Sequence, residues 1–394
     1  MKFEDMAEFE LRIQLDRLSY IDALLKRKTY CDFPPRKIYI EPTNICNLKC
    51  VHCVHNGALT RPAGHMSLGS YKGMIEQIKP LRLHTKIQFT GVGEPFINKN
   101  LFDMIKYASD YGFFTLMNTN ATILTKERAE KLIDSGLDYL HVSIDGITRE
   151  SYESIRIGGD FYKVIENIFT LFEARYEKKG YHLAVILGII NQRRNQKEVQ
   201  LFTEYFERFP FHHVVVGELF NHMGAIDEAN IAYMGKKAIQ QKDYPACNTP
   251  WDLLSFNCDG SAVGCNYDFD NRYVIGNFTE DKVLDIWNSE KMQYFRKCVL
   301  EREYGEIEKN GPLCSTCTIK WQKTYQIPTG FHEEVARMED YLVRAVKRTA
   351  FHRTRNEEFR GKEEYILSNR DSLIKELNNL DNACKTLQPL NLNG

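Results

Sequence analysis

The sequence predicts an α/β fold whose main part is a barrel, closed or partly closed, of parallel strands. Two observations lead to this prediction. Short β-type runs alternate with helical patterns from Arg36 to about Gly224, as expected for a parallel sheet of βα units. A cysteine-rich loop directly follows the first strand candidate, and active-site residues of barrels lie where the strands end.

The strand candidates are Lys37–Glu41, Lys86–Thr90, Phe113–Asn118, Tyr139–Ile144, His182–Ile190 and His213–Leu219. Helical patterns lie between them, near 69–79, 98–111, 126–135, 161–179 and 195–208. Around this barrel (36–225) we expect an N-terminal helix (1–35), a linker (226–246), a cysteine-containing module (247–328) and a helical extension (329–394). The N-terminal helix is expected to pack on the outside of the barrel.

Composition limits the function. The chain has 394 residues, a net charge of −1 and eleven cysteines. The balanced charge gives no reason to expect nucleic acid or a membrane as a partner. The acidic start MKFEDMAEFE is not a signal peptide, and no apolar run is long enough to span a bilayer. We therefore expect a cytoplasmic protein whose clustered cysteines are metal or redox ligands.

One stretch carries the strongest chemical signal. Cys46, Cys50 and Cys53 have C-x3-C-x2-C spacing, with His52 one place before the last cysteine. Cysteine thiolates hold 4Fe–4S clusters. Three ligands would leave one iron open, and an open coordination position is what metal chemistry requires. A zinc loop or reduced core cysteines is the alternative.

This run resembles the signature of the radical S-adenosylmethionine (SAM) superfamily, including the aromatic place filled here by His52. The resemblance implies a partial (β/α)6 TIM-like barrel. It also implies that SAM chelates the fourth iron and is cleaved to a 5′-deoxyadenosyl radical once a flavodoxin or ferredoxin has reduced the cluster.

Further motifs extend the resemblance. Gly91-Val92-Gly93-Glu94-Pro95 follows the second strand and matches a motif whose glycine backbone and glutamate contact the SAM amino group, with Val92 where glycine is frequent. Ser143 and Asp145 match residues that reach the SAM ribose or carboxylate, or they cap the next helix.

Three further positions are SAM-contact candidates. Asn118 begins a turn similar to the family's TNG, with Ala121 in place of glycine; an Asx turn is an equal alternative for Asn118. Arg156 is expected either to bind the SAM carboxylate through two hydrogen bonds of its guanidinium or to form a surface ion pair. Asn191 lies at the tip of the fifth strand, where relatives contact SAM.

A second cysteine set follows the linker. Cys247, Cys265, Cys314 and Cys317 form a C-x17-C arrangement with a later C-x2-C, and Asp259-Gly260 reads as a hairpin turn between Leu254–Asn257 and Ser261–Gly264. A helical run from Lys282 to about Arg302 comes next. The pattern resembles the SPASM and twitch modules, which implies a fully ligated auxiliary 4Fe–4S cluster. A four-cysteine zinc site is the alternative.

The resemblance implies hydrogen abstraction from a small-molecule substrate, with the auxiliary cluster taking an electron. This favours dehydrogenation of a secondary alcohol in a sugar, aminocyclitol or related metabolite. Alternatives are a radical epimerase, with Cys258 or Cys298 as hydrogen donor, a maturase of ribosomal peptides, and a non-enzymatic cysteine–metal protein. The basic residues of the extension indicate a solvated helix face, a phosphate-bearing substrate or a dimer contact: Arg344, Lys347, Arg348, Arg353 and Arg355.

Overall fold

The computed structural model describes residues 12, 15–16, 18–226, 247–318 and 359–386. Its centre is a nine-stranded sheet in the order β11-β10-β9-β1-β3-β4-β5-β7-β8. Six of its seven parallel strands form the predicted barrel sheet: β1 (Lys37–Ile40), β3 (Lys86–Phe89), β4 (Phe114–Thr119), β5 (Tyr139–Ser143), β7 (Ala184–Asn191) and β8 (His213–Glu218).

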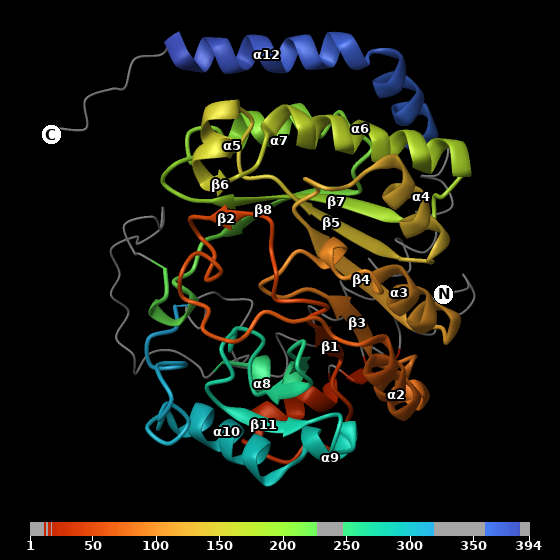
Figure 1. The fold of residues 1–394 in the computed structure, drawn as a ribbon. Helices are drawn as coiled ribbons and strands as arrows, with labels where there is room; N and C mark the ends of the chain where they lie inside the picture. Colours follow the sequence, from red (N-terminus) through yellow and green to blue (C-terminus); the bar gives the residue numbers. More distant parts are fainter. Residues whose placement is uncertain (1–11, 13–14, 17, 227–246, 319–358, 387–394) are drawn as a thin grey trace, which may run out of the picture.

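Helices cover the outer face of this sheet (Figure 1). They are α2 (Leu68–Ile78), α3 (Leu101–Asp110), α4 (Lys126–Asp134), α5 (Arg149–Ile155), α6 (Phe161–Lys178) and α7 (Val199–Phe206). Hydroxyl or carboxylate side chains cap several of them, including Thr125 at α4 and Asp160 at α6, because these groups accept from the free N–H groups of a first turn. The alternation predicted between strands and helices is confirmed.

The strands show why one face of the sheet is free for chemistry. In β1, β3 and β4, every second side chain is buried, and the residues between are half-buried. Side chains alternate across a strand, so Ile38, Ile87 and Met117 pack toward the helices. Tyr39, Gln88 and Asn118 consequently share the inner face.

The cysteine-containing module continues the same sheet. β9 (Leu253–Phe256) runs parallel to β1, with Ile38 opposite Leu254, and β10 (Ser261–Val263) and β11 (Val274–Asn277) add antiparallel strands. Gly260 closes the predicted hairpin with φ +89°. The predicted run 282–302 is two helices, α9 (Val283–Trp287) and α10 (Glu290–Glu301), because Ser289 caps a new helix.

The N-terminal segment contacts the barrel, where Asp16 Oδ2 lies 2.7 Å from His84 Nδ1 just before β3, and it contacts the cysteine-containing module as well. Residues 18–25 are helical, but the chain after them is fastened to the cysteine-containing module. Trp251, on α8 (Thr249–Asp252), donates to the Lys28 carbonyl, and Arg296 on α10 donates to Thr29. Trp287 likewise donates to the Phe33 carbonyl. The sequence pattern did not show this additional contact with the module.

The C-terminal extension packs on the barrel helices. A helical stretch at 359–368 leads into α12 (Arg370–Thr386), which lies over α6 and α7 (Figure 1). Arg175 of α6 forms a fully buried ion pair with Glu363 at 2.5 Å, and Tyr205 of α7 donates to the Leu373 carbonyl. The predicted linker and the basic run from Arg344 to Arg355 lie outside the described residues, apart from position 226.

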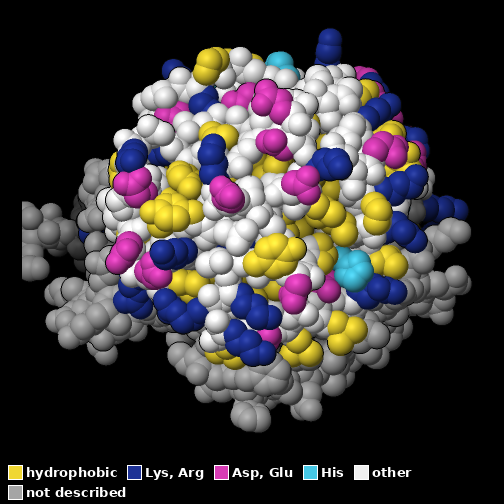
Figure 2. Space-filling model, turned by 90° about the horizontal axis from the view of Figure 1, so that it is seen from below, with side chains coloured by type: hydrophobic (Ala, Val, Ile, Leu, Met, Phe, Trp, Pro, Cys, Tyr) yellow, Lys and Arg dark blue, Asp and Glu magenta, His cyan; other side chains and the backbone are white. Residues whose placement is uncertain are grey.

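Among the described helices, none is both long and apolar enough to cross a membrane. The face in Figure 2 mixes Lys and Arg side chains with Asp and Glu side chains over the surface that the structure describes.

Candidate active site between two cysteine sets

The first cysteine loop leaves the end of β1 and is held by its own neighbours. Asn44 donates to the Pro62 carbonyl and accepts from Gly64 N, at 2.8 and 2.7 Å. The short strand β2 (Lys49–Cys50) pairs with β6 (Arg156–Ile157). This places Cys50 directly opposite Arg156, so the cysteine loop and the predicted SAM-carboxylate arginine lie together.

The three thiols lie close enough for their charges to interact. Burial raises the pKa of Cys46 to about 11 and of Cys50 to about 12, and raises that of Cys53 as well. All three cysteines are free of disulfide bonds. A metal cluster bound to the thiolates would replace the protons that burial favours.

The Gly91–Pro95 segment is packed tightly on the cysteine loop. A Cβ at Gly93 would lie 2.2 Å from the Thr43 carbonyl oxygen. Gly91, at φ +158°, leaves room for Glu41. The glycines therefore allow the chain to approach itself, which is a structural reason for them besides the predicted contact with SAM.

Glu94 is almost fully buried and its carboxylate is already engaged. Oε1 accepts from Thr119 Oγ1 at 2.7 Å, and Oε2 accepts from Asn120 N at 2.8 Å. Burial raises its pKa, and these hydrogen bonds oppose that rise. Glu94 thus connects the cysteine loop to the end of β4; its contact with SAM remains a prediction.

At the end of β4, the Asx turn belongs to Asn120, whose Oδ1 accepts from Thr122 N at 2.9 Å. Asn118 instead accepts from Gln88 at 3.3 Å and faces the inner cavity. The alternative of an Asx turn at Asn118 is therefore wrong, because the turn begins two residues later.

Asp145 and Arg156 form a buried ion pair. Asp145 Oδ2 lies 2.7 Å from Arg156 Nη2, and Asp145 Oδ1 accepts from Ile190 N at 2.8 Å. The surface ion pair considered for Arg156 is wrong, since its side chain is 7% exposed. The helix-cap alternative for Asp145 is wrong too, because Thr148 caps α5.

Other predicted SAM contacts gather around this pair. His52 Nε2 is 3.5 Å from Asp145 Oδ2, and burial lowers the His52 pKa to about 4, so the imidazole is neutral. Ser143 ends β5, and Asn191 ends β7.

The unpartnered atoms here fit SAM. Arg156 Nε is a buried donor without a hydrogen bond, and Asn191 Oδ1 and Gln192 Oε1 are buried acceptors without one. The carboxylate of SAM can accept from Arg156 Nε. Its ammonium, amine and hydroxyl groups can donate to Asn191 Oδ1 and Gln192 Oε1. Arg156 and Asn191 would hold it, together with Gln192, which the sequence analysis missed.

The second cysteine set comes from three loops: Cys247 before α8, Cys265 after β10, and Cys314 with Cys317 in the loop after α10. Burial raises the pKa of Cys265 and Cys314, and each is further raised by the other cysteines. Within the described residues, however, no three His, Cys, Asp or Glu side chains could hold one metal ion.

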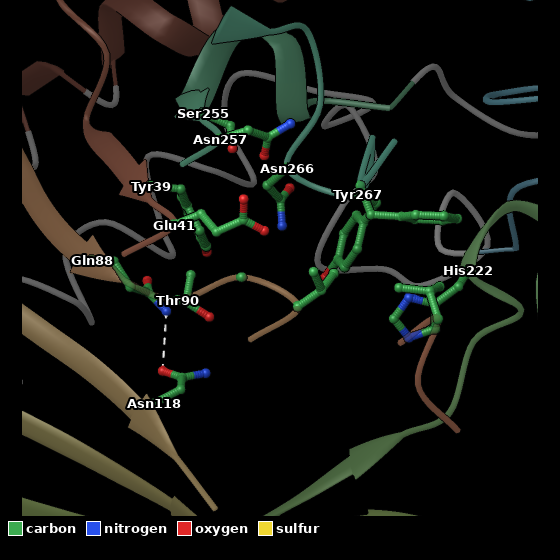
Figure 3. Close-up of a pocket in the computed structure, with 14 residues that line it drawn as sticks. Tyr39, Glu41, Gln88, Thr90, Asn118, His222, Ser255, Asn257, Asn266 and Tyr267 are labelled. Carbon is green, nitrogen blue, oxygen red and sulfur yellow. Dashed lines mark hydrogen bonds between the residues drawn. The ribbon is translucent and has the colours of Figure 1, made fainter. Parts of the chain in front are cut away.

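A cavity of about 230 Å³ lies between the two sets. Its barrel wall carries Tyr39, Glu41, Gln88, Thr90 and Asn118, and its module wall carries Ser255, Asn257, Asn266, Tyr267 and Phe269 (Figure 3). Val54, next to Cys53, and Tyr267, two residues after Cys265, both line it. The cavity therefore touches both cysteine loops.

Sequence reasoning missed most of these lining residues. Glu41 is the clearest case: Arg61 Nη2 contacts both its carboxylate oxygens at 2.9 Å, and Cys258 N donates to Oε2 at 2.9 Å. Its place two residues after Tyr39 on the first predicted strand was a usable signal, since both side chains share one face. Arg61 and His222 had no such signal, because their loops are irregular.

The two candidate hydrogen-donor cysteines lie differently. Cys258 is buried beside the cavity, with Arg61 Nη1 3.9 Å from its sulfur. Cys298 is buried within α10. Neither lines the cavity.

Comparisons with known proteins show the families of both parts of the chain. The model of the radical SAM superfamily matches residues 40–199, and that of the SPASM iron–sulfur cluster-binding domain matches residues 247–318. An AdoMet-dependent heme synthase of Methanosarcina barkeri is 34% identical over 36% of this chain and 40% of its own length. A SAM-dependent 2-deoxy-scyllo-inosamine dehydrogenase of Niallia circulans is 24% identical over 71% of this chain and 91% of its own.

Solved structures share the fold. BtrN in complex with AdoMet and 2-DOIA covers 73% of this chain and 94% of its own, with TM-score 0.51 and 21% identity. The match with native anSMEcpe with bound AdoMet covers 87% of this chain and 99% of that protein, with TM-score 0.52 and 14% identity. SuiB of Streptococcus suis bound to its precursor peptide covers 76% and 73%, with TM-score 0.54 and 15% identity.

The fold and the two cysteine sets define an iron–sulfur enzyme built on a partial α/β barrel. The chain belongs to the radical SAM superfamily and carries a SPASM-type iron–sulfur cluster-binding domain. Its cofactors are accordingly SAM, a 4Fe–4S cluster in the barrel, and an auxiliary iron–sulfur cluster in the second domain.

Proposed function

We propose that the enzyme dehydrogenates a secondary alcohol of a small polyhydroxylated molecule, such as a sugar or an aminocyclitol. The observation that carries this proposal is the cavity that touches both cysteine loops. A substrate in it would lie beside the SAM-binding cluster and beside the auxiliary cluster. This is the arrangement that a net two-electron oxidation needs.

The lining favours hydroxyl and amine groups over anions. Four amide side chains offer both donors and acceptors: Gln88, Asn118, Asn257 and Asn266. Asn266 Oδ1 is buried without a hydrogen bond. Among the described residues, the lining contains no Lys or Arg side chain, so these residues offer no cation to a phosphate or carboxylate.

The cavity size also limits the substrate. Its volume of about 230 Å³ is below the roughly 300–1,000 Å³ of sites for drug-sized ligands. A single ring suits it better than a peptide segment, so the peptide maturase is the less favoured alternative. A radical epimerase would need a hydrogen donor, and Cys258 lies behind the lining.

The reaction removes one hydrogen atom, one proton and one electron from the H–C–OH group. SAM held by Arg156, Asn191 and Gln192 would supply the group that takes the hydrogen atom, once a flavodoxin or ferredoxin has delivered an electron. The hydroxyl proton would leave oxygen for a base of the protein, and the auxiliary cluster held by Cys247, Cys265, Cys314 and Cys317 would take up the remaining electron, which gives the ketone. The amide side chains orient the ring, and the two walls exclude water.

We propose that His222 is the base that accepts the hydroxyl proton of the substrate. Its imidazole lines the cavity, stacked on Phe220 with ring centroids 4.0 Å apart, and no hydrogen bond engages its nitrogens in the described structure. Burial lowers its pKa to about 3, so it enters the reaction unprotonated. Glu41 is less suited, because Arg61 and Cys258 N occupy its carboxylate.

The turn that carries His222 is held firmly. His222 and Met223 have φ of +42° and +59°, a conformation that other residues than glycine rarely adopt. Asn221 is tied to the C-x2-C loop, donating to the Thr316 carbonyl at 2.6 Å and accepting from Thr318 N at 3.1 Å. The auxiliary loop thus fixes the position of the proposed base.

The experiment uses 2-deoxy-scyllo-inosamine as probe, deuterated at its carbinol carbons, with the reconstituted, reduced enzyme. Deuterium in the 5′-deoxyadenosine and a ketone three mass units lighter than the deuterated probe, which has lost one deuterium and one proton, support the proposal. A related panel of unphosphorylated sugars and their phosphates tests the charge preference. Deuterium transfer from a peptide or a sugar phosphate alone would overturn it.

A further inference from the structure

The side chain of Asn120, in the turn after β4, has a fixed orientation. It is 7% exposed, and Oδ1 accepts from Thr122 N at 2.9 Å and Thr122 Oγ1 at 2.6 Å. Since a backbone N–H can only donate, this end of the amide must be the oxygen. The amide nitrogen therefore points the other way.

That nitrogen meets the first cysteine loop. Nδ2 lies 3.1 Å from Asn47 Oδ1 and 3.9 Å from Cys46 Sγ. Its two hydrogens thus have two acceptors, one an amide oxygen and the other a predicted cluster ligand. The distance to sulfur is long for N–H···O but suits the larger sulfur atom.

The turn cannot easily move away. Asn120 N donates to Glu94 Oε2 at 2.8 Å. From the opposite side, Asn167 of α6 donates to the carbonyls of Ala121 and Thr122 at 2.8 and 3.0 Å. Asn167 supports the same turn without contacting the sulfur, which makes it a matched control.

We propose that Asn120 raises the reduction potential of the cluster bound by Cys46, Cys50 and Cys53, by donating a hydrogen bond to Cys46 Sγ. Reduction adds negative charge to the cluster and its sulfurs, so an N–H donor stabilises the reduced form more than the oxidised form. Asn120 is a positioning residue. The inference rests on the family, and not on the proposed substrate.

The test is an anaerobic redox titration, followed by EPR, of the reconstituted full-length enzyme without substrate. The SAM-binding cluster is recognised as the signal that changes when SAM is added, and the auxiliary signal is an internal reference. For Asn120→Ala we expect reduction of the first cluster to become about tenfold less favourable, which is about 59 mV for one electron. Asn120→Asp keeps the Thr122 bonds but places a carboxylate at the sulfur, so it should lower the potential further.

Asn167→Ala should leave both potentials unchanged. The proposal is overturned if neither Asn120 variant shifts the first cluster, if both clusters shift together, or if Asn167→Ala has the same effect. If the Asn120 variants bind no iron, a measurement on the wild-type enzyme still tests the proposed hydrogen bond. With selectively 15N-labelled asparagine, hyperfine spectroscopy of the reduced cluster should detect a coupled side-chain nitrogen, and its absence refutes the contact.

Discussion

Asp145 and Arg156 form an ion pair of 2.7 Å beneath the cysteine loop, at 0% and 7% side-chain exposure. Asp145 also accepts from Ile190 N, and Arg156 lies opposite Cys50 in the β2–β6 pairing. One pair of charges thus joins the ends of β5 and β7 to the cysteine loop. Its removal should therefore affect folding as well as SAM binding.

Arg156→Met or Asp145→Asn should each reduce the free energy of unfolding by about 3–5 kcal/mol, because each leaves a buried charge unpaired. Anaerobic denaturant unfolding without SAM measures this loss. Lys106→Met, which breaks an exposed pair with Asp110, is the control and should cost less than about 1 kcal/mol. Wild-type stability in both buried variants would show that the pair serves only SAM.

Gly93→Ala should prevent correct assembly of the first cluster. The new Cβ would lie 2.2 Å from the Thr43 carbonyl oxygen. The backbone at Thr43 cannot move away without displacing the cysteine loop that follows it. Iron analysis should find about four irons fewer per chain than in the wild type. Gly73→Ala is the matched control: nothing lies within 4 Å of its Cβ, and it sits within α2. It should keep all the iron and gain stability, since alanine favours a helix.

Much of the fold could be predicted because strand and helix periods differ so clearly between Lys37 and Leu219. The cysteine sets were visible from spacing alone. The contacts between distant segments could not be predicted. The sequence could not show that β9 would pair with β1, or that Arg61 would reach Glu41 from an irregular loop. For Asn118, a SAM contact and an Asx turn were equal alternatives, and only the hydrogen bonds showed that the turn belongs to Asn120.

Stability should fall as the pH is lowered from about 6.5 toward 4, partly through His141. Burial lowers the pKa of His141 to about 4, whereas an unfolded histidine has a pKa near 6.5. The unfolded state therefore binds more protons in this window, and acid favours unfolding. His141→Gln should flatten the slope of unfolding free energy against pH relative to the wild type. Equal slopes from pH 7 to 4.5 would contradict this assignment.

His222→Gln should separate hydrogen abstraction from product formation. Deuterium transfer from a deuterated substrate to 5′-deoxyadenosine should persist, because that step needs no base. The ketone formed per 5′-deoxyadenosine should fall by about 10²–10⁴-fold, the usual contribution of a general base. His55→Gln serves as the control, since His55 does not line the cavity. An unchanged ketone yield in His222→Gln would assign the proton to another group.

The central claim is that a secondary alcohol is oxidised, with the substrate lying between the two clusters. The measurement that tests it most directly is the product balance in D2O with an undeuterated substrate. We expect one ketone for each SAM cleaved and no solvent deuterium on the product carbon. A product that remains an alcohol and carries one deuterium at the attacked carbon would contradict the account and identify an epimerase.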